Sequence, residues 1–289
     1  TLGPDSILVA ATGGVGTKTR LATAMNRFDT VGHDIVNHCI NDILEQGARP
    51  LFFLDRLATN RSEPLIAATI VGGMAAACRL AGIALLGGET AEMPDIYKKD
   101  ALDIGGSIVG VVQRDELIDH STLDIGDAVL AIKSSGLHTN GYSLVRQVFK
   151  HWNLDDRVAA LGTSLGNALL EPHRSYLSEI TRLRSAGIAI RSLVHITAGG
   201  LAENPVRVLP DGATLRIDRA TWRVPALFAL LQSQGNVTDE EMFRTFNMGA
   251  GMLVVIRSED TATALQTLGP DAWRIGEIVA REDEPVLLA

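Results

Sequence analysis

The order of its apolar runs constrains the fold of this chain more than any other feature. Short runs with strand-like composition are separated by helical patterns, and they lie at residues 7–12, 51–59, 83–89, 102–113, 127–135, 192–197, 214–220, 252–258 and 273–280. Strands and helices do not alternate strictly, so the order argues against a barrel of repeated β–α units. We therefore expect an α/β (α+β) fold of two domains, for which 289 residues with 46% hydrophobic content suffice.

A charged, turn-rich segment, RDELIDHSTLDIGD, occupies residues 114–127. Such composition is typical of a linker between domains. We place the boundary near residue 118, which predicts an N-terminal domain over residues 1–118 and a C-terminal domain over residues 119–289.

Charge and cysteine content restrict the partners and the compartment. A net charge of −8 and a pI near 5.4 argue against binding to nucleic acid or to an anionic membrane. The longest apolar stretch, residues 65–88, is rich in Ala and Gly and contains Arg79, so we expect a buried helix followed by a strand. Cys39 and Cys78 are expected to be buried thiols of a cytoplasmic protein. The missing initial Met suggests a trimmed N-terminus.

A glycine-rich turn, GGVGTK at residues 13–18, follows the first apolar run. Thr17 precedes Lys18, so the P-loop spacing fails, and Thr19 takes the place of the last glycine of the dinucleotide-binding fingerprint. Backbone N–H groups of such a turn can still approach a phosphate, with Lys18 as a point charge. The alternative is a tight strand-to-helix turn with a surface lysine.

The helix predicted from His33 to Gly47 carries its polar side chains on one face. A polar helical face is ordinarily solvated, but this one has three carboxylates and neither Lys nor Arg. Oxygen ligands of this kind suit Mg²⁺. Glu89 and Glu92 follow a later strand-like run and would complete the same site.

In the second half, SSGLHTNGYSLVR at residues 134–146 lies between a strand and a helix N-terminus, where exposed N–H groups favour an anion. His138 in this loop has the chemistry of a general acid or base, although a loop histidine is often incidental. Gly199 and Gly200 belong to a second, less specific candidate anion loop.

Eight colinear segments resemble those of the phosphoribosylformylglycinamidine cyclo-ligases, or AIR synthetases. They span nearly the whole chain and read GGVGTK, DTVGHD, NDILEQGARPLFFLD, GGETAEMP, SSGLHTNGYSLVR, LLEPHRSY, HITAGGLAEN and EMFRTFNMGAGM. The resemblance implies a homodimer formed through strands of the N-terminal domain and a C-terminal α/β domain. It also implies ATP-dependent closure of formylglycinamidine ribonucleotide to aminoimidazole ribonucleotide in purine biosynthesis, through an O-phosphoimidate.

The resemblance further implies roles for individual residues. The ATP site would comprise Gly14, Gly16, Thr17, Lys18, Asp29 and Thr90, and the Mg²⁺ ligands would be Asp34, Asn41, Asp42 and Glu89. The small-molecule substrate would be bound by Ser134, Ser135, Gly136, His138, Asn140, Gly199 and Gly200. Lys18 and His138 would be the catalytic residues.

The chain departs from the family pattern at several positions. Gly13 stands where the family has an acid, Asn60 stands where it has glycine before a basic residue, and the family's glycine-rich N-terminal segment of several tens of residues is absent. Because the acid is an expected metal ligand, a catalytically impaired paralogue is one alternative. Another is a different ATP-dependent phosphotransferase of the same superfamily, such as selenophosphate synthetase or thiamine-phosphate kinase.

Overall fold

The computed structural model describes residues 2–281 and 283–289. Contacts divide the chain into two compact units. Unit 1 contains the segments up to Ile43, Ala48–Asp115 and Ser135–Ser175, and unit 2 contains Leu44–Gly47, Glu116–Ser134 and Tyr176–Ala289. The boundary near residue 118 stays a prediction, since the contacts group the chain more finely than a single cut would.

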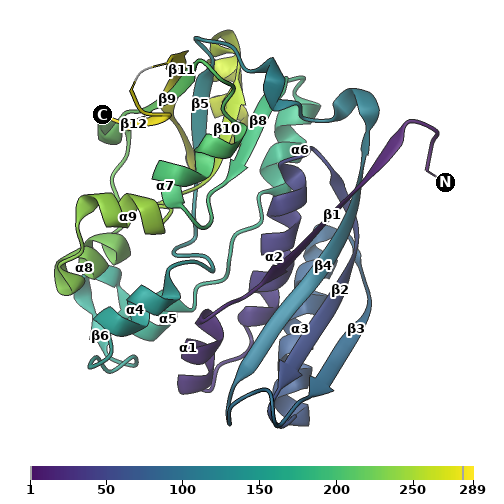
Figure 1. Ribbon diagram of the computed structural model, residues 1–289, viewed down its shortest axis with the longest axis vertical. Coiled ribbons are helices and arrows are strands. Elements are labelled where there is room, and N and C mark those ends of the chain that lie inside the picture. Colours follow the sequence, from purple (N-terminus) through teal and green to yellow (C-terminus); the bar gives the residue numbers. More distant parts are fainter. Residues whose placement is uncertain (1, 282) are drawn as a thin grey trace. The chain divides into compact units, whose positions relative to one another are not determined.

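Unit 1 is built on a four-stranded mixed sheet in the order β1-β4-β2-β3 (Figure 1). Its strands are β1 (Ser6–Gly14), β2 (Arg49–Thr59), β3 (Ala84–Glu92) and β4 (Leu102–Gln113). The helices of this unit are α1 (Lys18–Ala24), α2 (Val31–Leu44), α3 (Pro64–Ala81), α4 (Tyr142–Val148) and α5 (Leu165–Leu169), with a short hairpin of β6 (Arg157–Val158) and β7 (Thr163–Ser164).

Helices α2 and α3 cover one face of this sheet (Figure 1). They approach each other closely because glycines meet at the crossing: a Cβ on Gly32 would lie 2.2 Å from the Ile70 carbonyl oxygen. The predicted helix over residues 64–81 is confirmed, but it is not buried all round. Leu65 and Leu80 are each 84% exposed, whereas Ile70 is fully buried.

Helix α3 is also the one helix in the described residues that is long and apolar enough to cross a membrane, by length and composition alone. It is followed by strand β3, as the sequence predicted, and it packs on β2 and β3. The cysteines on α2 and α3, Cys39 and Cys78, are both buried and free.

Unit 2 contains a six-stranded mixed sheet in the order β12-β9-β11-β5-β10-β8. The strands are β5 (Ala128–Lys133), β8 (Ile190–His195), β9 (Ala213–Ile217), β10 (Ala250–Ile256), β11 (Ala272–Ala280) and β12 (Val286–Leu288). The helices are α6 (Leu177–Ser185), α7 (Gly200–Glu203), α8 (Ala226–Gly235), α9 (Asp239–Thr245) and α10 (Thr261–Leu268). The β10 residues are all buried, as expected for a central strand with both faces covered.

Candidate functional site

The glycine-rich turn is shorter than the sequence suggested. Gly13 and Gly14 end strand β1, opposite Gly106 and Gly105 of β4, and the chain turns only at Val15–Thr17. The Val15 N–H donates to the Ile104 carbonyl at 2.9 Å, and Gly16 adopts a φ of +65°, which glycine tolerates best. Gly16 and Thr17 are exposed and Val15 is buried, so these two residues are the part of this turn that faces solvent.

Lys18 does not lie at the surface, contrary to the prediction of a point charge open to a phosphate. Its side chain is fully buried, and the ammonium lies 2.8 and 2.9 Å from the two carboxylate oxygens of Asp34. It also donates to the Glu171 carbonyl at 2.8 Å. Burial lowers the pKa of Lys18 and raises the pKa of Asp34, and their direct ion pair opposes both shifts. The pair thus ties α1 to α2.

The polar face of α2 packs against the segment at residues 171–175, which corrects the alternative of a solvated face. Asp34 accepts the His173 backbone N–H at 2.7 Å, and Asn37 donates to the His173 carbonyl at 2.6 Å. Asn41 donates through Nδ2 to the Arg174 carbonyl at 2.8 Å. These side chains anchor a loop more than 130 residues away in sequence.

Three histidines of unit 1 meet beside this face. The His138 and His173 rings stack with centroids 3.9 Å apart and planes inclined by 18°, and His38 meets His173 edge-on at 5.3 Å. His138 has a positive φ of 60° and is completely buried. Thr139 joins the rings, because its hydroxyl lies 3.0 Å from His38 Nδ1 and 3.4 Å from His173 Nδ1.

Hydrogen-bond direction assigns the proton positions in this cluster. Asn41 Nδ2 faces a carbonyl oxygen, so it is a donor, and it lies 3.2 Å from His173 Nε2. A neutral His173 therefore carries its proton on Nδ1, toward Thr139. The Thr139 hydroxyl can then donate to His38, whose Nε2 lies 3.3 Å from Asp42.

The four predicted Mg²⁺ ligands do not converge. Asp34 is held by Lys18, Asn41 by the Arg174 carbonyl, and Asp42 lies beside His38. Glu89 of β3 pairs with Arg56 of β2. This register places the Glu89 side chain on the sheet face away from α2. In the described part of the chain, Glu89 makes no hydrogen bond or ion pair with the other three.

The remaining predicted ATP residues are also dispersed. Asp29 has a 62% exposed side chain and lies 3.8 Å from the Arg27 guanidinium, and Thr90 is exposed on β3. Thr17 belongs to the glycine-rich turn, and its hydroxyl lies 3.3 Å from that of Ser143.

The predicted substrate residues fall in both units. In unit 1, the Ser135 N–H points at His138 Nε2 from 3.4 Å, Gly136 is half-buried, and Asn140 has a buried Nδ2 without a hydrogen-bond partner in the described residues.

In unit 2, Ser134 donates to Asn247 at 3.0 Å. Gly199 precedes the four-residue α7 and Gly200 is its first residue, both with positive φ. A Cβ on Gly200 would lie 2.2 Å from the Phe243 carbonyl, so close packing requires this glycine.

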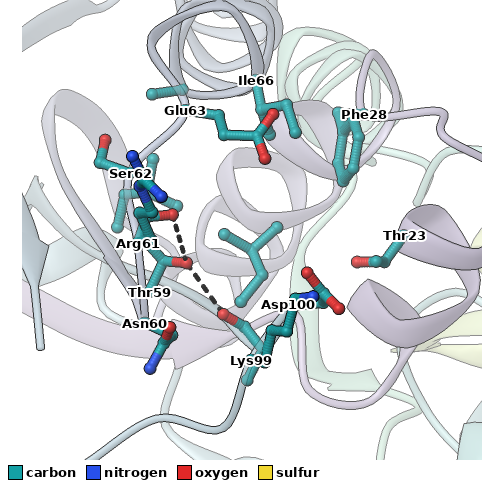
Figure 2. Close-up of a pocket in the computed structure, with 14 residues that line it drawn as sticks. Thr23, Phe28, Thr59, Asn60, Arg61, Ser62, Glu63, Ile66, Lys99 and Asp100 are labelled. Carbon is teal, nitrogen blue, oxygen red and sulfur yellow. Dashed lines mark hydrogen bonds between the residues drawn. The ribbon is translucent and has the colours of Figure 1, made fainter. Parts of the chain in front are cut away.

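A cavity that sequence reasoning missed opens in unit 1, with a volume of about 360 Å³ (Figure 2). Its apolar walls are formed by Phe28, Leu57, Ile66, Ala67 and Leu102, and its polar residues include Thr23, Arg61, Glu63, Lys99 and Asp100. These residues come from α1, the loop before α2, strand β2 and the connection that follows it, the first turn of α3, and the segment that leads into β4. No short motif joins them, so only the fold could reveal the cavity.

Family models match almost the whole chain. Residues 1–112 match "AIR synthase related protein, N-terminal domain", and residues 124–288 match "AIR synthase related protein, C-terminal domain". The chain belongs to the AIR synthase family. Its relatives include the phosphoribosylformylglycinamidine cyclo-ligases of Desulfitobacterium hafniense (strain DSM 10664 / DCB-2) and Burkholderia pseudomallei (strain 668). Each is 47% identical over 97% of this chain, and the matches cover 83% and 81% of those proteins.

Solved structures share the AIR synthase fold at lower identity. The hydrogenase maturation protein HypE in complex with ATP matches with a TM-score of 0.73 at 20% identity, covering 100% of this chain and 82% of that one. Thiamine-monophosphate kinase from Stenotrophomonas maltophilia K279a matches with a TM-score of 0.70 at 18% identity, covering 99% and 86%. These similarities confirm the two-domain α/β fold predicted from the sequence.

Proposed function

We propose that this chain catalyses the ATP-dependent cyclisation of formylglycinamidine ribonucleotide to aminoimidazole ribonucleotide, with release of ADP and phosphate. The observation that carries this proposal is the 42–47% identity, over 97–98% of the chain, to proteins named phosphoribosylformylglycinamidine cyclo-ligase. The substrate is a small molecule, and the reaction belongs to purine biosynthesis in the cytoplasm.

The reaction needs an activated leaving group, because the formyl amide oxygen leaves poorly. ATP transfers its γ-phosphoryl group to that oxygen, and the amide N–H proton is lost as the O-phosphoimidate forms. The amidine nitrogen then forms a bond to the activated carbon, and the C–O bond to phosphate breaks. A base accepts the proton released from the attacking nitrogen. Positioning and charge stabilisation supply most of the catalysis of phosphoryl transfer.

We assign the phosphate-binding role to the backbone N–H groups of the exposed residues Gly16 and Thr17. Lys18 acts as a positioning residue, since its buried ion pair with Asp34 holds the start of α1 in place. His138, oriented by its stack on His173, is the proposed proton acceptor.

Mg²⁺ does not fit the predicted ligand set in this arrangement. The Asp34 carboxylate is already paired with an ammonium, and Glu89 faces the other side of the sheet. We propose that Mg²⁺ accompanies ATP as its counter-ion, and we assign it no ligand among these residues.

A homodimer formed through the N-terminal sheet is proposed as well. The sheet face opposite α2 carries apolar side chains, and among them Leu8 is 58% and Leu54 is 37% exposed. Burial of such side chains in a second copy would be favourable.

The test is ATP-dependent formation of aminoimidazole ribonucleotide by the full-length protein, measured beside a Gly13→Asp variant. Activity of the unmodified protein supports the proposal. Activity only in the variant would instead indicate an impaired paralogue, which the loss of the family's acid at residue 13 favours. ADP release with selenide or thiamine phosphate, and none with formylglycinamidine ribonucleotide, would contradict the proposed substrate.

A further inference from the structure

A second, smaller cavity of unit 1 opens among helices α1, α4 and α5, which lie close together (Figure 1). Its volume is about 150 Å³, and its apolar walls include the buried side chains of Leu21, Val145, Phe149 and Leu169. The half-buried Trp152 also lines it and meets the Phe149 ring edge-on, with centroids 5.3 Å apart. A cavity of this size with aliphatic and aromatic walls holds a group as large as a benzene ring.

The charged residues of this cavity all carry the same sign. Arg20, Arg146 and Lys150 line it, and neither Asp nor Glu does. Over residues 2–281 and 283–289, none of these three side chains forms an ion pair with a carboxylate, whereas Arg191 pairs with two. Such a group of cations is unexpected in a chain with a net charge of −8. Because neighbouring like charges repel each other, the cluster favours the binding of an anion.

The guanidinium of Arg146 gives a second, independent indication. Its Nε is buried and has no hydrogen-bond partner in the part of the chain that the structure describes. A buried N–H group without an acceptor is energetically costly and therefore rare. An ordinary solvated cationic face would leave this N–H exposed to water, so its burial argues for an acceptor supplied by a ligand. Carboxylates and phosphates are the acceptors that match a guanidinium best, because they take two parallel hydrogen bonds from it.

We propose that this cavity binds a small organic anion, a carboxylate or phosphate monoester that carries an apolar group about as large as a benzene ring. The apolar group packs against Phe149 and the other apolar walls, and the anionic group lies against Arg146 and the two further cations. An inorganic anion would leave the apolar walls unused, and a neutral hydrocarbon would leave the cations without a counter-charge. The proposal does not depend on the proposed function, in which the residues of this cavity have no role.

Two substitutions test the charged and the apolar part of the site separately. Arg146→Met removes the charge and the buried N–H but keeps an unbranched side chain. Ala24→Trp places a large ring at the exposed end of α1, where it would fill the apolar part of the cavity. Arg79→Met and Gln147→Trp are the matched controls, since both residues are exposed and neither lines the cavity. Thermal unfolding checks that each variant is folded.

Binding of phenyl phosphate and of benzoate is measured by calorimetry on the full-length protein, beside inorganic phosphate and benzyl alcohol. We expect at least one of the two organic anions to bind with a Kd at least tenfold lower than those of inorganic phosphate and benzyl alcohol. That Kd should rise at least tenfold in Arg146→Met and in Ala24→Trp, and it should stay unchanged in Arg79→Met and Gln147→Trp. A preference for phenyl phosphate or for benzoate would support the site and identify its anionic group.

The proposal would be overturned if the unmodified protein bound neither organic anion, or if binding stayed unchanged in either of the two cavity variants. Equal affinity for inorganic phosphate would also overturn it, because the apolar walls would then contribute nothing. Equal affinity for benzyl alcohol would do the same, because the three cations would then contribute nothing. Each of these results would leave the proposed cyclisation, which has its own assay, intact.

Discussion

Replacing Lys18 by Met tests the buried ion pair that joins α1 to α2. The substitution keeps most of the side-chain volume but leaves the Asp34 carboxylate buried without its counter-charge. Removing one partner of a buried pair typically costs about 3–5 kcal/mol in the free energy of unfolding. At about 2–4 °C for each kcal/mol, the melting temperature should fall by roughly 6–20 °C.

The loss should depend on pH in a defined direction. Burial already raises the pKa of Asp34, and without Lys18 only the smaller effects of the His173 N–H and of His33 oppose that shift. A carboxyl whose pKa is higher in the folded protein binds more protons folded than unfolded, so the variant gains stability as pH falls. Urea denaturation at pH 7.5 and 5.5 should show a smaller difference from the unmodified protein at the lower pH.

The control is the double variant Lys18→Met with Asp34→Asn. It removes both charges and keeps an oxygen to accept the His173 N–H. Removing both partners of a buried pair is often nearly neutral, and the lost bond to the Glu171 carbonyl adds about 1 kcal/mol. The stabilising role of the buried pair would be refuted if Lys18→Met lowered the free energy of unfolding by less than about 1 kcal/mol. It would also be refuted if the double variant were as unstable as the single one.

The remaining predictions concern the histidines. In Gly13→Asp, the new Cβ would lie 3.1 Å from the His38 ring. We therefore expect overpacking to lower the free energy of unfolding by about 1–3 kcal/mol, and His38→Ala in the same chain to restore it. Denaturation of the single and double variants measures both effects. His173→Phe keeps a flat ring against His138 but loses both ring nitrogens. This substitution should lower the free energy of unfolding by about 1–3 kcal/mol, and it should lower kcat without changing the KM for ATP. An unchanged kcat would show that His173 does not position His138. Burial lowers the pKa of His120, so the folded protein binds fewer protons than the unfolded chain as pH falls below about 6.5. Stability should therefore fall between pH 7.5 and 5.5, and less steeply in His120→Gln; equal slopes would contradict this.

The sequence by itself determined most of the elements and the family. The helix over residues 64–81 and the strands near residues 51, 192, 252 and 273 follow from apolar periodicity and from glycine and proline punctuation, which are local properties. Colinear motifs identify a family for a related reason, because they are read along the chain and need no spatial information. The same local signals correctly excluded a P-loop at Lys18.

Only the tertiary structure decided what the polar side chains do. Periodicity shows that Asp34, Asn37 and Asn41 share a helix face, but it cannot show that this face meets the loop around His173 rather than water. Glu89 lies beyond the sheet from this face because strand register, a long-range property, sets which side of a sheet each residue occupies.

The segment at residues 135–175 illustrates the same limit. It follows the first strand of unit 2 in sequence, yet it packs with unit 1 and contributes His138, His173 and the carbonyl that binds Lys18. A charged side chain is buried only where a partner of opposite charge is brought to it by packing. The burial of Lys18 therefore depends on contacts made far along the chain, and its own neighbours in sequence contain no sign of it.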